Sequence, residues 1–130
     1  MKRAIATEAA PRALGPYAQA IADGALLFVS GQIGIDPVSG ELVGDTIEDE
    51  TRRVLQNLTA VLAAAGCSTA AVVRTTVYLT SLADFPRVNQ IYAELFREPY
   101  PARATVQVAA LPRGARVEID AIAIAESPDR

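Results

Sequence analysis

Residues 72–110, VVRTTVYLTSLADFPRVNQIYAELFREPYPARATVQVAA, decide the fold because they combine strand and helix periodicities in one short segment. Val72 to Thr80 is rich in Val, Thr and Tyr, which favour a strand. Asp84 to Phe96 places its apolar residues on one face of a helix. After two prolines, Arg103 to Ala110 alternates polar and apolar side chains, as a half-buried strand does. The segment therefore predicts two parallel strands joined by a right-handed helical crossover.

A longer helix is predicted upstream, from Asp45 to Ala65, because its apolar positions form one continuous stripe. Asp45 and Glu48 have the spacing of a capping box, which predicts that the helix starts there. Gly66 follows where a helix C-terminus favours a residue with positive φ.

A hairpin is predicted before this helix, where Tyr17 to Ala22 and Ala25 to Ser30 flank Asp23-Gly24. An Asp-Gly pair between two apolar runs is a strong hairpin signal, since both residues tolerate positive φ. A two-residue loop would pair Ala22 with Ala25. That register places Tyr17 opposite Ser30 on one face of the sheet.

Two further strands complete the expected order β-β-β-α-β-α-β-β. One runs from Lys2 to Thr7, and the other from Arg116 to Ala125, followed by a tail from Ser127 to Arg130. After Asp120 the last strand is nearly all apolar, which predicts burial on both faces. The order predicts an α+β fold, with a mixed sheet and both helices on one face.

The opposite face of this sheet is expected to carry Arg103, Thr105, Gln107 and Glu118, mixed with apolar residues and not covered by a helix of the chain. A half-apolar uncovered face implies a partner, most simply another copy of the same chain.

Composition narrows the functions further. The 130 residues are 51% hydrophobic and 21% charged, which excludes a disordered chain and suits a single domain over residues 1–130. The net charge of −3 disfavours a nucleic-acid partner. Without histidine and with one cysteine, the chain cannot form a zinc finger, a disulfide scaffold, a Ser-His-Asp triad or a Cys-His dyad. Neither a signal peptide nor a membrane span is apparent, so a cytoplasmic location without membrane partners is expected.

Several residues are candidates for chemistry, and each also has an ordinary interpretation. Arg103 begins a strand, where its guanidinium can bind both oxygens of a carboxylate or simply be solvated. Glu118 can position or deprotonate a water if it is partly buried, or it can be an ordinary polar-face residue. Asp120 points the same way. After Ser30, Gly31 allows a ligand to approach the backbone closely.

Motifs along the whole chain are more specific together than any single residue. They are Ala13-Leu14-Gly15-Pro16-Tyr17, Val29-Ser30-Gly31-Gln32-Ile33-Gly34, Val88-Asn89-Gln90-Ile91-Tyr92, Pro101-Ala102-Arg103-Ala104 and Val117-Glu118-Ile119-Asp120-Ala121. In these motifs the chain resembles the RidA/YjgF family of reactive intermediate deaminases, also described as perchloric-acid-soluble proteins.

The resemblance implies a chorismate-mutase-like α+β fold, assembled as a homotrimer with three pockets between subunits. It also implies hydrolytic deamination of small 2-imino acids and their enamine tautomers, such as 2-iminobutanoate and 2-iminopropanoate, to 2-keto acids and ammonia. Pyridoxal-phosphate enzymes release these intermediates and are damaged by them, so the activity protects such enzymes. Neither a metal nor an organic cofactor is expected.

The resemblance also assigns roles to residues. Arg103 would bind the substrate carboxylate and Glu118 would orient the water, so these two are the expected catalytic residues. The other expected substrate-binding residues are Tyr17, Ser30, Gly31, Asn89 and Thr105. Several members of the family carry a cysteine where this chain has Thr105. That position is thought to act mainly through its backbone, so we expect activity to survive.

Two other classes of function stay open at this point. One is a non-catalytic regulatory protein that binds small carboxylates through the same arginine. The other, which the acidic composition supports only weakly, is the ribonuclease or translation-inhibitor activity described within the family. Turnover of freshly generated 2-iminobutanoate would separate catalysis from binding.

Overall fold

A computed structural model of the chain describes residues 1–125, and the expected tail from Ser127 to Arg130 lies outside them. Its strands are β1 (Arg3–Ile5), β2 (Ala20–Asp23), β3 (Leu26–Gln32), β4 (Val72–Leu79), β5 (Ala102–Gln107) and β6 (Val117–Ile124). Its α-helices are α1 (Ile47–Ala64) and α2 (Phe85–Leu95). Short 3₁₀ turns are η1 (Thr69–Ala71), η2 (Leu82–Asp84) and η3 (Pro112–Gly114). This order confirms the predicted β-β-β-α-β-α-β-β sequence of elements.

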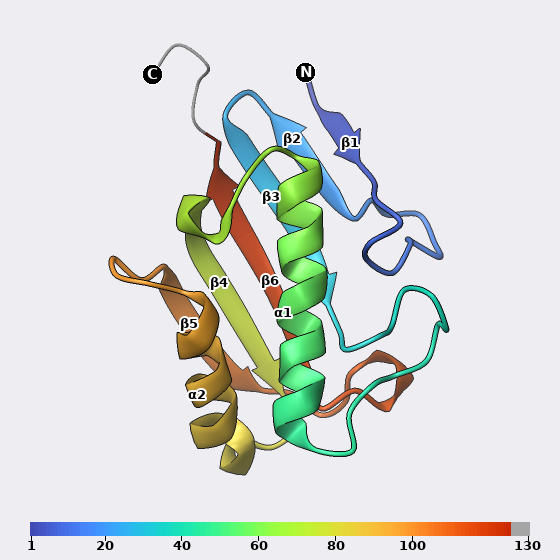
Figure 1. The fold of residues 1–130 in the computed structure, drawn as a ribbon, viewed down its shortest axis with the longest axis vertical. Helices are drawn as coiled ribbons and strands as arrows, with labels where there is room; N and C mark the ends of the chain where they lie inside the picture. The colour runs from blue at the N-terminus through green and yellow to red at the C-terminus, as the bar shows by residue number, and fades with distance from the viewer. Residues whose placement is uncertain (126–130) are drawn as a thin grey trace.

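The strands form one mixed sheet in the order β1-β2-β3-β6-β4-β5. As expected, β4 and β5 are parallel, whereas β6 is antiparallel to both β3 and β4. Both helices lie in contact on one face of this sheet, as Figure 1 shows. The core lies between the helices and this face, around Leu58, Leu62, Val77 and Ile119.

The opposite face, which we call the outer face, has no helix over it in the described chain (Figure 1). Exposed apolar side chains on it include Leu26, Phe28 and Ile124, each more than 40% exposed. The expectation that the end of the last strand is buried on both faces is therefore wrong for a single chain. Its alternate residues face the helices and are buried, while Ile122 and Ile124 lie on the uncovered side.

The start of α1 differs from the capping-box prediction. The N-cap is Thr46, whose side chain accepts a hydrogen bond from the Asp49 amide at 3.1 Å. Asp45 is one residue too early for that geometry, so its spacing to Glu48 was misleading. The other end is as predicted: Gly66 has φ +77°, and the amides of Gly66 and Cys67 donate to the last turn of the helix.

A partly buried ion pair joins the first turns of α1 to the residue before β6. Glu50 is fully buried, and its carboxylate accepts from the Nε and the backbone amide of Arg116, each at 2.7 Å. Arg116 also donates to the Gly44 carbonyl at 3.0 Å. A Cβ on Gly44 would meet the Glu50 backbone, so glycine is needed for this close approach.

The hairpin between β2 and β3 forms, but its register is not the predicted one. Asp23 pairs with Leu26, so the loop is Gly24-Ala25. Only Gly24 needs positive φ (+60°), as in a turn whose first central residue is glycine, and Asp23 is left to extend the strand. The shift places Gln19, not Tyr17, opposite Ser30, whose amide donates to the Gln19 carbonyl at 3.0 Å.

Candidate functional site

Arg103 lies on β5 beside α2, with three side chains of that helix around its guanidinium. Its Nη1 donates to Asn89 Oδ1 at 2.8 Å. The guanidinium also lies over the rings of Phe85 and Tyr92, at 5.3 and 4.8 Å from their centroids. Such cation–π contacts attract the cation to the ring faces without neutralising its charge.

The helix spacing explains why these three residues converge. Phe85, Asn89 and Tyr92 are separated by four and three residues, so they share one face of α2. Tyr92 is buried, and its hydroxyl lies 2.7 Å from the hydroxyl of Thr75 on β4. Burial raises the pKa of Tyr92, which keeps the hydroxyl protonated. Sequence reasoning did not place Phe85 and Tyr92 at the site, although the spacing from Asn89 was a usable signal.

A hollow of about 440 Å³ opens beside Arg103. It is lined by Asn89, Tyr92, Ala93, Tyr100, Pro101 and Arg103. Within residues 1–125, Arg103 forms no ion pair with a carboxylate. An exposed cation held by a neutral amide and two aromatic rings, next to a hollow, is well suited to bind an anion.

Glu118 lies on β6 among a second group of candidate residues, on the outer face. On the neighbouring strand β3, one extra residue lies between Val29 and Gln32, so Ser30 and Gly31 form a bulge opposite Asp120. A Cβ on Gly31 would overlap the Glu118 carboxylate, which shows how closely that backbone and the carboxylate approach. Ser30 donates through Oγ to the Ala18 carbonyl at 2.6 Å. Burial, and then the charge of Asp120, raise the pKa of Glu118.

The structure separates the two groups, contrary to the sequence prediction. Arg103 and Thr105 pair in register with Thr75 and Val77, whose side chains are buried beneath the helices. Arg103, Thr105 and Gln107 therefore lie on the helix side of the sheet, whereas Glu118 lies on the outer face. The expectation that all four share one face is wrong. The mistake came from assigning every polar side chain of an alternating strand to the uncovered face.

Tyr17 belongs to neither group in a single chain. It precedes β2 in a loop, with its side chain 58% exposed. The hollow that it lines is formed by residues 4–8, 12–13 and 17–19, which include no other expected site residue. The predicted neighbourhood of Tyr17 and Ser30 is therefore wrong, because it depended on the incorrect hairpin register.

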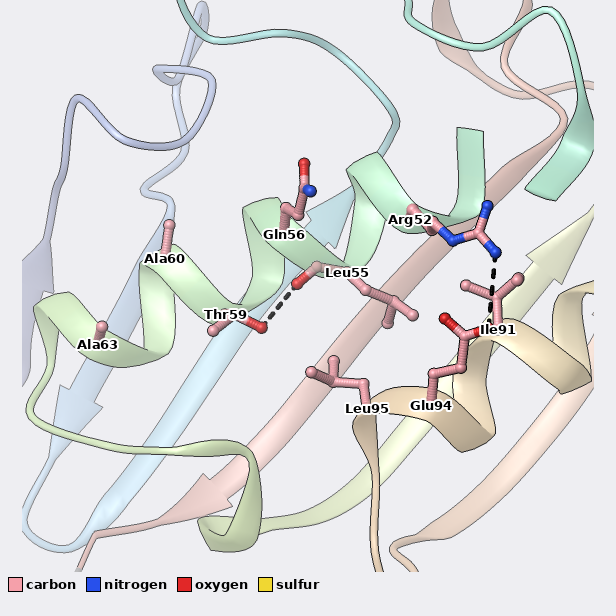
Figure 2. A pocket seen from close by; sticks show the side chains of 9 residues that line it. All are labelled: Arg52, Leu55, Gln56, Thr59, Ala60, Ala63, Ile91, Glu94 and Leu95. Atoms are coloured by element: carbon pink, nitrogen blue, oxygen red, sulfur yellow. Dashed lines mark hydrogen bonds and ion pairs between the residues drawn. The ribbon is translucent and has the colours of Figure 1, made fainter. Parts of the chain in front are cut away.

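A different depression, of about 510 Å³, lies between α1 and α2 (Figure 2). Its floor is apolar, with Leu55, Ile91 and Leu95, and an ion pair between Arg52 and Glu94 (3.5 Å) crosses its rim. None of the expected site residues lines it, and the charges at its rim already pair with one another. We therefore do not assign the substrate to this groove.

Residues 1–125 contain no cluster of three or more His, Cys, Asp or Glu side chains that could bind a metal ion. Neither α1 nor α2, the α-helices of that part of the chain, has the length and apolar character of a membrane-crossing helix.

Comparison with known proteins places this geometry in context. Residues 7–125 match a family model described as endoribonuclease L-PSP. The chain is 48% identical over 124 residues to the human 2-iminobutanoate/2-iminopropanoate deaminase, covering 95% of this chain and 90% of that protein.

Solved structures agree with the sequence match. A Thermotoga maritima crystal structure superposes with a TM-score of 0.95 at 53% identity, covering 98% of this chain and all of that one. The Escherichia coli protein TdcF with bound serine has a TM-score of 0.90 at 40% identity, covering 95% of this chain and 99% of that one.

Proposed function

Because the chain belongs to the RidA/YjgF family, we propose that it hydrolyses 2-imino acids and their enamine tautomers, 2-iminobutanoate and 2-iminopropanoate among them, to 2-keto acids and ammonia. Sequence identity of 48–49% to two deaminases, over 95% of this chain, supports this activity. One observation of the structure carries the proposal: Arg103 is a positioned cation beside a hollow, without a carboxylate partner among the described residues. Its guanidinium would bind the substrate carboxylate through two oxygens.

Glu118 is suited to carry the protons that move when water adds to the imine. Water adds to C2 of the imine, so that a C–O bond forms and the electron pair of the C=N bond moves to nitrogen. Glu118 accepts a proton from this water and returns it to the nitrogen of the resulting carbinolamine. Glu118 next carries the hydroxyl proton to the same nitrogen, the C–N bond breaks with its electron pair leaving on nitrogen as ammonia, and the C=O bond of the keto acid forms. A carboxylate of raised pKa serves both proton transfers better than an ordinary one.

Arg103 and Glu118 cannot act on one small substrate within one chain, because β4 separates their strands and they lie on opposite faces of the sheet. We propose that the site forms between subunits of a homotrimer, with Arg103 from one copy and Glu118 from the next. The exposed apolar outer face supports this assembly, since a large apolar surface favours a protein partner. In that arrangement Tyr17 and Thr105 also border the pocket.

The test generates 2-iminobutanoate in place with an amino-acid oxidase or dehydratase and follows keto-acid formation. The wild type should accelerate it above the spontaneous rate. Arg103→Ala should abolish the acceleration and Arg103→Lys should restore only part of it, because an ammonium cannot reproduce the guanidinium fork. Arg97→Ala, which removes another exposed arginine, is the matched control. Unchanged turnover in Arg103→Ala, with an intact fold by thermal melt, would refute the role of Arg103.

A second function remains a candidate because a relative binds an amino acid: the TdcF structure contains serine. If the wild type binds a keto acid in calorimetry but never accelerates imine hydrolysis, this chain is a carboxylate-binding regulatory protein. Nothing in the net charge of −3 favours RNA, despite the name of the matched family model.

A further inference from the structure

The carboxylate of Asp120 is held in place by two hydrogen bonds from a neighbouring strand. It lies on the outer face of β6, and its Oδ2 accepts from the Tyr78 hydroxyl at 2.9 Å. Its Oδ1 accepts from the backbone amide of Thr76 at 3.2 Å. Both donors come from the neighbouring strand β4. The hydrogen bond to Asp120 is the main cause that raises the pKa of Tyr78, so this hydroxyl stays a donor.

This fixed carboxylate lies beside Glu118. The two residues are two apart on β6, so both point to the outer face. On β4, Tyr78 pairs in register with Glu118. The residues of β3 that lie close to Glu118 are Ser30 and Gly31, and neither has a titratable side chain. Within residues 1–125, the titratable groups facing Glu118 are therefore Asp120 from β6 and Tyr78 from β4. Neither supplies a positive charge.

We propose that Asp120, held by Tyr78 and the Thr76 amide, is a positioning residue whose fixed negative charge makes Glu118 a stronger base for imine hydrolysis. This inference rests on the proposed function, because it adds a device that adjusts the proposed water-activating group. A negative charge on the same strand face disfavours ionisation of a neighbouring carboxyl and so makes that carboxyl a stronger base. Asp120 is held by two donors, and burial together with the charge of Asp120 raises the pKa of Glu118.

Tyr78 has a second, opposing effect in this arrangement. Its hydroxyl donates to Asp120 and so spreads part of that negative charge. Removing Asp120's charge and removing the hydroxyl should therefore shift the titration of Glu118 in opposite directions. A general loss of packing would not produce opposite shifts.

The experiment measures kcat/KM for 2-iminobutanoate against pH, with the spontaneous rate subtracted. Its acidic limb reports deprotonation of the base in the free enzyme. In Asp120→Asn the limb should move to lower pH and the plateau should fall. In Tyr78→Phe the limb should move to higher pH, and Glu41→Gln, which removes an exposed loop charge, should leave it unchanged. An Arg103 approaching from a neighbouring copy is present in every variant, so differences between variants isolate Asp120.

A substrate-free measurement separates this inference from the proposed function. Infrared difference spectra of the carboxyl band, with Glu118→Gln to assign it, report the titration of Glu118 directly. If the wild type lacks deaminase activity but the Glu118 band shifts as stated, the function is wrong and the coupling stands. If Asp120→Asn leaves the band and the acidic limb where the wild type has them, or if both variants shift them in one direction, the inference is overturned.

Discussion

Arg103 and Arg116 show how surroundings give one residue type two different uses. Arg116 is paired: its Nε and backbone amide both reach the buried carboxylate of Glu50. Arg103 is held by a neutral amide and by the faces of two aromatic rings. The first arrangement uses the charge for the fold, because a buried carboxylate needs a partner. The second positions the cation and leaves its charge available for a ligand.

Loss of the Asn89 amide should therefore weaken catalysis without weakening the fold. In Asn89→Ala, Arg103 loses the hydrogen bond at 2.8 Å that orients Nη1. A hydrogen bond to a charged group contributes about 1.5 kcal/mol or more, so kcat/KM should fall roughly tenfold or more. Gln90→Ala, at the next exposed position of α2, is the control. Equal kcat/KM in both variants would contradict the positioning role of Asn89.

Gly31 should be needed for the position of the Glu118 carboxylate. A Cβ in Gly31→Ala would displace that carboxylate, which is the flexible end of a side chain. We expect kcat to fall about 10²-fold, the scale of general acid–base catalysis, with little change in melting temperature. In Gly44→Ala the added Cβ meets the Glu50 backbone at a φ of +120°, so there the melting temperature should fall. Full activity in Gly31→Ala would show that the displaced carboxylate does not act in the reaction.

At the scale of elements, the sequence predicted both α-helices and every strand of residues 1–125, because apolar periodicity depends on the same burial that forms them. It placed the hairpin register wrongly, because either Asp23-Gly24 or Gly24-Ala25 supplies the positive φ that a tight turn needs. It also placed Arg103 on the wrong face. At the edge of a sheet, the side beneath a short helix is only partly covered, so polar residues such as Thr105 can lie there.

For the candidate site, the sequence motifs predicted Arg103, Asn89, Gly31 and Glu118, and the structure shows which of these lie together. Asn89 contacts Arg103, and Gly31 contacts Glu118. The tether of Asp120 by Tyr78 was not predicted, because it depends on the alignment of β4 with β6 across 42 residues of sequence. Pairing of distant strands leaves no local pattern in the chain.

The ion pair between α1 and β6 should contribute substantially to stability. Arg116→Met would leave the fully buried Glu50 carboxylate without its cation. Such a loss costs about 3–5 kcal/mol for a fully buried pair, and we expect the lower end because Arg116 is 38% exposed. Arg52→Met removes two surface ion pairs, to Asp49 on the same helix and to Glu94 on α2, and should cost less than about 1 kcal/mol. Urea unfolding measures both values, and equal costs would contradict this account.

At the scale of the whole molecule, the proposed assembly depends on the outer face. The proposed trimer should have about three times the 13.7 kDa mass of the chain in sedimentation or light scattering. Phe28→Glu places a charge among the apolar residues of the outer face, where Phe28 is 45% exposed, and burial of an unpaired charge is costly. The variant should dissociate to folded monomers and lose deaminase activity. A wild-type monomer at micromolar concentration would refute both the trimer and the intersubunit site.

The opposite orientation of Arg103 and Glu118 has a genetic consequence. Arg103→Ala and Glu118→Gln should each be inactive as homotrimers, yet each keeps the group that the other has lost. When subunits of the two variants are mixed, unfolded and reassembled, some interfaces in the hybrids join an intact Arg103 to an intact Glu118. Random assembly of equal amounts makes such interfaces roughly a quarter of the total. A mixture of the two inactive variants should therefore regain activity. It could not do so if both residues had to come from the same chain.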